Sequence, residues 1–271
     1  MDNKSVFELF LFFKGINYIK PAMESRIDGI IVDLEHIGKE SRQACADTEI
    51  NYNDFGDLLN VRVNCASKVI CRINRFGGYT PVEIEKAIEI RADELLLPMA
   101  RSAREVEAVL KQASGRCGVG ILIETKEALE IAEDLARLPL CRVYVGFNDL
   151  AIDRNTPNIF TPIIDGTLER LRNIFRDFSF GFAGLTLPDK GFPIPCNLLI
   201  GEMARLNCSF TFLRRSFYRD TEGKDMPIEV GKILDALDKA SKRSLPEIRK
   251  QRKALEEAVR SYPNNKTILN R

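Results

Sequence analysis

The sequence predicts a (β/α)8 barrel, and three observations support this fold class. Eight short apolar runs rich in Val, Ile, Leu and Phe recur along the chain at spacings of roughly 20 to 30 residues. Most of these runs are apolar almost throughout, as expected of strands buried on both faces of a parallel sheet. Segments with helical periodicity separate most of them, and a chain of 271 residues has the length of one such barrel.

The eight apolar runs are the predicted strands. Because periodicity does not reveal closure, an open doubly wound sheet remains an alternative, but eight βα units is the number that closes a barrel. In chain order the runs are Phe7–Phe13, Gly29–Leu34, Lys68–Ile73, Glu94–Met99, Gly118–Ile123, Arg142–Gly146, Phe178–Ala183 and Phe210–Arg214.

Helix signals lie between the predicted strands. Thr80-Pro-Val-Glu has the pattern of a capping box with Thr80 as the N-cap residue, and Ser102-Ala-Arg-Glu repeats it. Apolar positions three and four apart predict further helices over Glu127–Leu138 and Glu229–Ala240.

The end of the chain, from Ser244 to about Tyr262, is dense in Lys, Arg and Glu and has the apolar spacing of one more amphipathic helix. We therefore expect a single barrel domain over residues 1–243. Residues 244–271 are expected to form a C-terminal helical extension that packs on the barrel or on a neighbouring subunit.

Composition and charge favour a cytoplasmic protein. Lys and Arg number 40 and Asp and Glu 39, so the formal net charge of +1 provides no field that would attract nucleic acid or an anionic membrane. No apolar run reaches the roughly 20 residues that span a bilayer, and the N-terminal run lacks the features of a signal peptide. The seven cysteines are scattered without a CxxC pair, so we interpret them as reduced thiols. We expect neither nucleic acid nor membrane as a partner.

Polar residues directly follow several predicted strands, where a barrel builds its active site. Glu124 ends one apolar run and Asp149 comes shortly after the next, so their carboxylates should lie close enough to share one hard cation such as Mg²⁺ or Mn²⁺. The alternative is that each carboxylate only caps the helix that follows it.

His36 follows an earlier predicted strand, and Arg72 lies at the end of the next one. His36 is the only histidine, and imidazole is the side chain best suited to move a proton near neutral pH. The guanidinium of Arg72 could hold a carboxylate or a developing oxyanion. The structural alternatives are a packing role for His36 and a salt bridge at the barrel rim for Arg72.

Five motifs in register resemble the HpcH/HpaI aldolase and citrate lyase β-subunit family. They cover the chain from about residue 27 to residue 150, with weaker matches through Gly181-Phe-Ala-Gly184 and Phe212-Leu-Arg-Arg-Ser-Phe217. The motifs are Ile27-Asp-Gly-Ile-Ile-Val-Asp-Leu-Glu-His36, Arg72-Ile-Asn, Ala92-Asp-Glu-Leu-Leu-Leu-Pro98-Met, Ile121-Leu-Ile-Glu124-Thr and Val145-Gly-Phe-Asn-Asp149-Leu.

The resemblance implies a phosphoenolpyruvate/pyruvate-type barrel that acts on a small 2-oxo acid and forms homo-oligomers. Mg²⁺ or Mn²⁺, or alternatively Co²⁺, would be bound by Glu124 and Asp149. His36, paired with Glu89, would act as the base through a bound water, and Arg72 would stabilise the pyruvate enolate. Pro98 and Asn148, in two of the matched motifs, are assigned with Arg72 to the substrate pocket.

Three departures from the family pattern indicate a divergent subgroup with its own substrate. Arg91 stands where the family usually has Gly, and the segment between Pro98 and Gly118 lacks the longer loop by which typical aldolases of the family bind the aldehyde. The stretch Ile37–Gln43 also differs, and it could place Lys39, Arg42 or Gln43 over the substrate.

The hypothesis from the sequence is a metal-dependent carbon–carbon lyase that cleaves or forms a 4-hydroxy-2-oxo acid through a pyruvate enolate. Two alternatives remain open at this point. One is a citrate-lyase-like enzyme acting on an acyl-CoA thioester, and the other is a barrel that binds a metabolite without catalysis.

Overall fold

The computed structural model describes residues 7–38 and 53–262, and within these ranges it contains eight strands. They pair in parallel in the order β7-β6-β5-β4-β3-β2-β1-β8. Each apolar run singled out in the sequence contains one strand, so the prediction of eight strands is confirmed. The strands are β1 (Glu8–Phe12), β2 (Gly29–Asp33), β3 (Lys68–Arg72), β4 (Glu94–Leu97), β5 (Gly118–Ile123), β6 (Arg142–Val145), β7 (Ser179–Phe182) and β8 (Phe210–Phe212).

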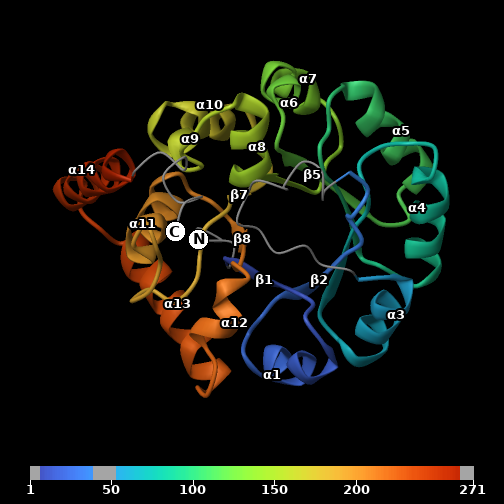
Figure 1. Ribbon diagram of the computed structural model, residues 1–271, viewed down its shortest axis with the longest axis horizontal. Coiled ribbons are helices and arrows are strands. Elements are labelled where there is room, and N and C mark those ends of the chain that lie inside the picture. The colour runs from blue at the N-terminus through green and yellow to red at the C-terminus, as the bar shows by residue number, and fades with distance from the viewer. Residues whose placement is uncertain (1–6, 39–52, 263–271) are drawn as a thin grey trace, which may run out of the picture.

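The two outer strands of this order, β7 and β8, meet and nearly close the sheet. The backbone N–H of Ser209 donates to the carbonyl of Phe180 over 3.0 Å, and the Thr211 hydroxyl donates to the carbonyl of Phe182 over 2.8 Å. Figure 1 shows the strands around a central axis with the helices outside them. The fold is therefore a (β/α)8 barrel, not an open doubly wound sheet.

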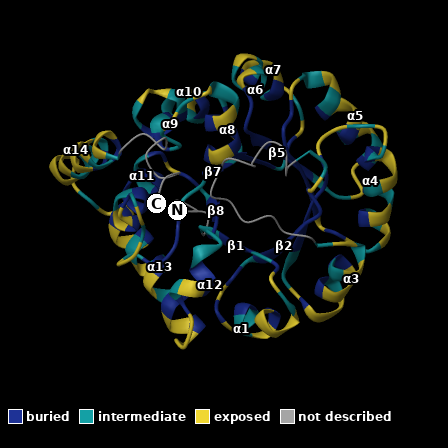
Figure 2. Ribbon diagram, in the orientation of Figure 1, coloured by how far each residue is buried: buried dark blue, intermediate teal, exposed yellow. Residues whose placement is uncertain are grey.

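The helices form the outer layer of the barrel and pack their buried faces on the strands (Figure 2). The predicted helix over residues 127–138 is divided into α6 and α7 at Ile131, whose backbone departs from helical geometry. The helices are the 3-10 helix η1 (Ile16–Tyr18), α1 (Ile19–Glu24), α3 (Phe55–Asn64), α4 (Thr80–Glu89), α5 (Ala103–Ala113), α6 (Lys126–Glu130), α7 (Ala132–Leu135), α8 (Phe147–Arg154), α9 (Thr161–Ile164), α10 (Thr167–Ile174), α11 (Cys196–Arg205), α12 (Ser216–Asp220), α13 (Met226–Ser241) and α14 (Leu245–Ser261).

The two predicted helix caps have different outcomes. Ser102 is the N-cap residue of α5, and its hydroxyl accepts a hydrogen bond from the backbone N–H of Glu105. Thr80 is instead the first residue of α4, and its hydroxyl accepts from the backbone N–H of Gly77 over 2.9 Å. The predicted capping box at Thr80 is therefore wrong, because this hydroxyl closes the turn that leads into the helix.

The core of the barrel is a layer of apolar side chains that point inward from the strands. It is separate from the larger cluster between the strands and the helices. Tyr144 and Phe212 stack in it, with ring centroids 4.0 Å apart. The inner layer consists of Phe10, Ile31, Ile70, Leu96, Leu122, Tyr144, Phe210 and Phe212.

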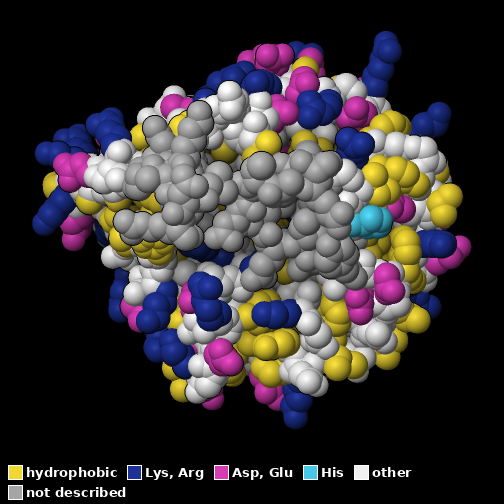
Figure 3. Space-filling view, viewed as in Figure 1, with side chains coloured by type: hydrophobic (Ala, Val, Ile, Leu, Met, Phe, Trp, Pro, Cys, Tyr) yellow, Lys and Arg dark blue, Asp and Glu magenta, His cyan; other side chains and the backbone are white. Residues whose placement is uncertain are grey.

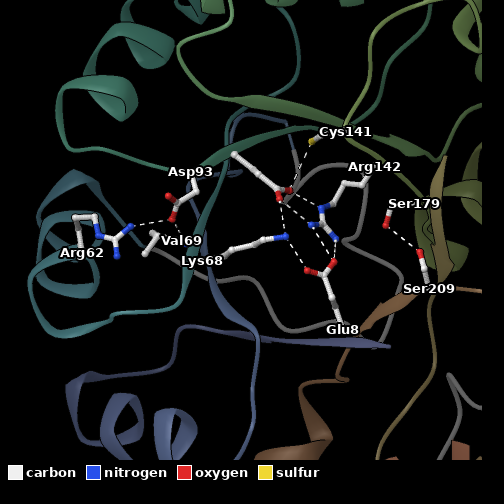
Figure 4. Close-up of polar contacts among 10 residues, drawn as sticks. Glu8, Arg62, Lys68, Val69, Asp93, Cys141, Arg142, Ser179 and Ser209 are labelled. Carbon is white, nitrogen blue, oxygen red and sulfur yellow. Dashed lines mark hydrogen bonds and ion pairs between the residues drawn. The ribbon is translucent and has the colours of Figure 1, made fainter. Parts of the chain in front are cut away.

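Four charged residues at the N-terminal ends of the strands form a cluster that we call the ion-pair plug: Glu8, Lys68, Glu94 and Arg142. Figure 4 labels Glu8, Lys68 and Arg142. Arg142 makes a bidentate ion pair with Glu94, and Lys68 Nζ lies 2.6 Å from a carboxylate oxygen of Glu8. The Arg142 guanidinium also lies over the ring of Phe10, 4.5 Å from its centroid. The interior is thus filled by charged pairs at this end and by apolar side chains above it.

Helix α14 lies at the edge of the molecule and packs against α11 and α9 (Figure 1). Glu202 on α11 is buried there, and both Arg205 and Arg252 bind its carboxylate. None of the helices in the described ranges is both long enough and apolar enough to cross a membrane.

Candidate functional site

The candidate site is the mouth of the barrel, formed by inward-pointing side chains at the C-terminal ends of the strands. Side chains alternate between the two faces of a strand, so a residue two positions beyond an inner-layer residue also points inward. This rule places Asp33, Arg72 and Glu124 in the mouth, beyond the inner-layer residues of β2, β3 and β5. Their exposed fractions are 0%, 7% and 5%. The mouth thus combines two carboxylates with one guanidinium, all largely out of contact with solvent.

Arg72 is the positive centre of the mouth. Its Nε and Nη2 donate to the two carboxylate oxygens of Asp33 over 2.7 and 2.6 Å, and its Nη1 lies 3.6 Å from Glu35 Oε2. The guanidinium also lies over the ring of Phe12, 5.3 Å from the centroid. Burial alone lowers the pKa of Arg72, but the charges of Asp33 and Glu35 outweigh burial and raise that pKa, so the side chain remains protonated.

Glu124 lies between two backbone segments, one directly after β4 and the other directly after β6. Its Oε2 accepts from the backbone N–H of Met99 over 3.4 Å, and Met99 has a left-handed backbone with φ 54°. On the other side the carboxylate lies against Gly146, where an added Cβ would be 2.3 Å from Glu124 Oε1. Thr125, not Glu124, is the N-cap residue of α6. The capping alternative for Glu124 is therefore excluded.

Asp149 follows β6, the strand that pairs with the strand of Glu124; it lies in the first turn of α8 and is 6% exposed. Asn148 precedes it and is exposed, whereas Pro98 is buried directly after β4. Carboxylates are the side chains that a hard divalent cation prefers, and Mg²⁺ and Mn²⁺ accept one or two of them and complete their coordination with water and substrate, so Glu124 and Asp149 are the residues that could hold such a cation. In the described ranges no group of three or more His, Cys, Asp and Glu side chains is arranged for a metal.

His36 lies at the same rim and is exposed (Figure 3, cyan). Its Nδ1 is 2.8 Å from the carbonyl oxygen of Leu34. Because a carbonyl only accepts hydrogen bonds, Nδ1 must carry the proton. In the neutral ring the proton acceptor is therefore Nε2.

Glu89 is not brought to His36. It is the last residue of α4, a helix that begins near the rim, after β3, and runs back toward the start of β4. Ten helical residues rise about 15 Å. The expected pairing of His36 with Glu89 is thus not formed within one chain, because α4 carries Glu89 away from the rim.

The structure adds to the site five residues to which the sequence assigned no role. Asp33 and Glu35 pair with Arg72. Asn74 and Glu83 form hydrogen bonds beside His36, and Arg215, after β8, lies 3.7 Å from Asp33. A polar residue after a strand was a usable signal for Asn74 and Arg215. For Glu83 the sequence suggested only a role in helix capping. Lys39, Arg42 and Gln43 lie outside the described residues.

The fold and the mouth define a (β/α)8 barrel whose polar groups gather at the C-terminal ends of its strands. No family model matches the chain, and no curated protein matches it. Solved structures with the same fold include RipC from Yersinia pestis (TM-score 0.55, 16% identical, covering 91% of this chain and 100% of that chain).

Two further solved structures share the fold. They are 3-hexulose-6-phosphate synthase from Salmonella typhimurium (TM-score 0.59, 14% identical, 86% of this chain and 99% of that chain) and a citrate lyase from Burkholderia xenovorans LB400 (TM-score 0.58, 13% identical, 93% of this chain and 81% of that chain). At these identities the similarity establishes the barrel alone.

Proposed function

We propose that this protein is a divalent-metal-dependent carbon–carbon lyase of the HpcH/HpaI aldolase and citrate lyase type, which cleaves or forms a 4-hydroxy-2-oxo acid through a pyruvate enolate. The observation that carries the proposal is the mouth, where a permanently charged arginine lies among buried carboxylates. A citrate lyase among the structures that share the fold supports it.

The chemistry assigns a role to each side chain. A cation held by Glu124 and Asp149, with Mg²⁺ or Mn²⁺ as the preferred choices and Co²⁺ as a third, would supply Lewis-acid polarisation of a 2-oxo group. Asp33 accepts from Nε and from one N–H of Nη2 of Arg72, so the remaining N–H groups of Nη1 and Nη2 are the donors available for a substrate oxygen. As the C3–C4 bond breaks, its electron pair moves toward the C2 oxygen, and the charge of Arg72 stabilises the resulting enolate.

His36 would take the proton of the substrate's 4-hydroxyl group. The neutral ring has its proton on Nδ1, so Nε2 is available as a base. Loss of this proton turns the 4-hydroxyl carbon into the carbonyl of the departing aldehyde, while the enolate left behind is protonated to pyruvate. The cleavage releases no net proton, because the proton taken from the hydroxyl group is balanced by the one that C3 of the enolate receives. The exposed ring can pass its proton to C3 through solvent and so return to the neutral form.

The test is pyruvate release from oxaloacetate and from 4-hydroxy-2-oxo acids by chelator-stripped protein, with Mg²⁺, Mn²⁺ or Co²⁺ added back. We expect metal-dependent release in the wild type, and a loss of at least about 100-fold in Glu124→Ala and Asp149→Ala. Glu130→Ala, an exposed carboxylate on α6, is the matched control. Folded protein that releases no pyruvate with any of these metals would refute the proposal and favour the acyl-CoA or ligand-binding alternatives.

A further inference from the structure

We propose that Asn74 and Glu83 are positioning residues that fix the segment carrying His36 at the barrel mouth. This inference rests on the proposed function, in which His36 moves a proton. Neither residue would touch the substrate, and both would act through the backbone of residues 36 and 37.

Asn74 holds the segment by its side-chain oxygen. Oδ1 accepts hydrogen bonds from the backbone N–H groups of His36 and of Ile37, each over 2.9 Å. An amide oxygen has two lone pairs, so these two donors use its full capacity. Asn74 is 1% exposed, and water therefore competes little for these bonds.

Glu83 determines which way the Asn74 amide faces. Asn74 Nδ2 donates to Glu83 Oε1 over 2.7 Å, and the Asn74 backbone N–H donates to Glu83 Oε2 over 3.1 Å. A carboxylate can only accept, so the NH2 group must face Glu83 and the oxygen must face His36. With the amide turned over, the NH2 group would meet the two backbone N–H donors, and its oxygen would meet the carboxylate.

The start of the His36 segment is tied to β3 through the backbone. Leu34 N–H donates to the carbonyl of Arg72 over 2.9 Å, and the His36 ring itself contacts the Leu34 carbonyl. Beyond Leu34, Asn74 accepts the hydrogen bonds of the His36 and Ile37 backbones. Without the two hydrogen bonds to Asn74, the imidazole should be able to move away from the position from which it reaches the substrate.

The experiment exchanges the two groups. In Asn74→Asp two carboxylates face each other, and in Glu83→Gln the new NH2 group faces one of the two donors of Asn74. In the double variant every bond can form again. The new carboxylate at position 74 accepts from the His36 and Ile37 backbones and from the new amide at position 83, whose oxygen accepts from the backbone N–H at position 74. Recovery in the double variant would show that the contact between positions 74 and 83, and not either side chain alone, is what is needed.

Two readouts are needed, and both are taken where all variants are folded. His36 is the only histidine, so the NMR signals of a single imidazole report its position without any assay of turnover. We expect the signals to shift and to broaden in each single variant, and kcat for pyruvate release to fall about 10- to 100-fold with little change in KM. Both should return close to wild type in the double variant. Glu107→Gln, on the exposed side of α5, is the control.

The outcomes separate this inference from the proposed function. Unchanged imidazole signals in both single variants would overturn the positioning role, whatever the activity. A double variant as impaired as the single variants would overturn it as well. Imidazole signals that respond and recover as expected, in a protein that releases no pyruvate, would support the positioning role and refute the lyase.

Discussion

At the scale of single residues, the candidate site depends on how closely charged groups approach the backbone. Gly146 shows this most directly, because the Glu124 carboxylate occupies the space that a side chain at position 146 would take. The backbone of Gly146, with φ −91° and ψ 119°, is one that any residue can adopt. The glycine is therefore required for the room that it gives to Glu124 and not for its conformation.

We predict that Gly146→Ala impairs the site much more than the fold. The added Cβ would be 2.3 Å from Glu124 Oε1, so the carboxylate must move. Divalent-cation affinity, measured by calorimetry, and pyruvate release should each fall on the order of 100-fold. The free energy of unfolding should fall by only about 1–3 kcal/mol.

The matched control is Gly231→Ala in α13, where, apart from neighbouring residues and backbone of the same helix, no heavy atom lies within 4 Å of the added Cβ. This helix position should gain about 0.5–1 kcal/mol of stability. Full cation affinity in Gly146→Ala would show that Glu124 is not a ligand in the position described.

The residues of the mouth differ in how far the sequence could predict them. Arg72 and Glu124 were found because Arg72 is a charged residue at the end of an apolar strand and Glu124 directly follows one, and the structure places both at the rim. Whether they bind substrate and cation stays a prediction. Glu83 could not be assigned, since its spacing within α4 does not say that it faces Asn74. Such a contact depends on how the helix is rotated about its axis, which no local pattern encodes.

At the scale of elements, the eight strands could be predicted because burial on both faces leaves a continuous apolar run. Helix starts were less certain. Ser102 caps α5 as its pattern indicates, whereas Thr80, with the same pattern, closes the preceding turn. A hydroxyl near a helix start has several backbone partners within reach, and the tertiary path of the chain selects among them.

Helix α14 gives the prediction that belongs to this scale. Arg252 binds Glu202 on α11 and Glu169 on α10, so it ties α14 to two neighbours. Arg252→Ala should weaken this attachment by about 1.5–3 kcal/mol. The loss is moderate because Arg205 still pairs with both oxygens of Glu202.

Hydrogen–deuterium exchange is the measurement. Amides of α14 should exchange faster in Arg252→Ala while those of the barrel strands stay protected. Lys250→Ala, an exposed position on the same helix, should leave exchange unchanged. If amide exchange became faster in the strands by the same factor, α14 and the barrel would unfold together.

At the scale of the whole molecule, the ion-pair plug ties together β1, β3, β4 and β6 at the N-terminal end of the barrel (Figure 4). Burial raises the pKa of Glu94, but the hydrogen bonds and the charge of Arg142 outweigh burial and lower that pKa overall. A carboxyl group whose pKa is lowered by folding adds stability above its unfolded pKa of 4.5, and this stability is lost as the pH falls through the folded value.

Glu94→Gln should therefore destabilise the protein by about 3–5 kcal/mol near neutral pH, because Arg142 would lose its buried partner. The difference from wild type should shrink as the pH falls below 4.5. Urea unfolding across this pH range is the measurement, and Glu107→Gln should follow the wild-type curve. If the difference in the free energy of unfolding stayed constant with pH, the pair with Arg142 would not be what makes stability depend on pH in the acid range.

The filled interior determines how a substrate can enter the barrel and how products can leave it. Charged pairs and stacked rings occupy the barrel from its N-terminal end up to the floor of the mouth, so small molecules find no passage along the axis. In a reaction at the mouth, the substrate must then enter, and both product fragments must leave, through the same opening at the C-terminal ends of the strands. The fragment seated deepest, which in the proposed chemistry is the one bound to Arg72, has to leave last.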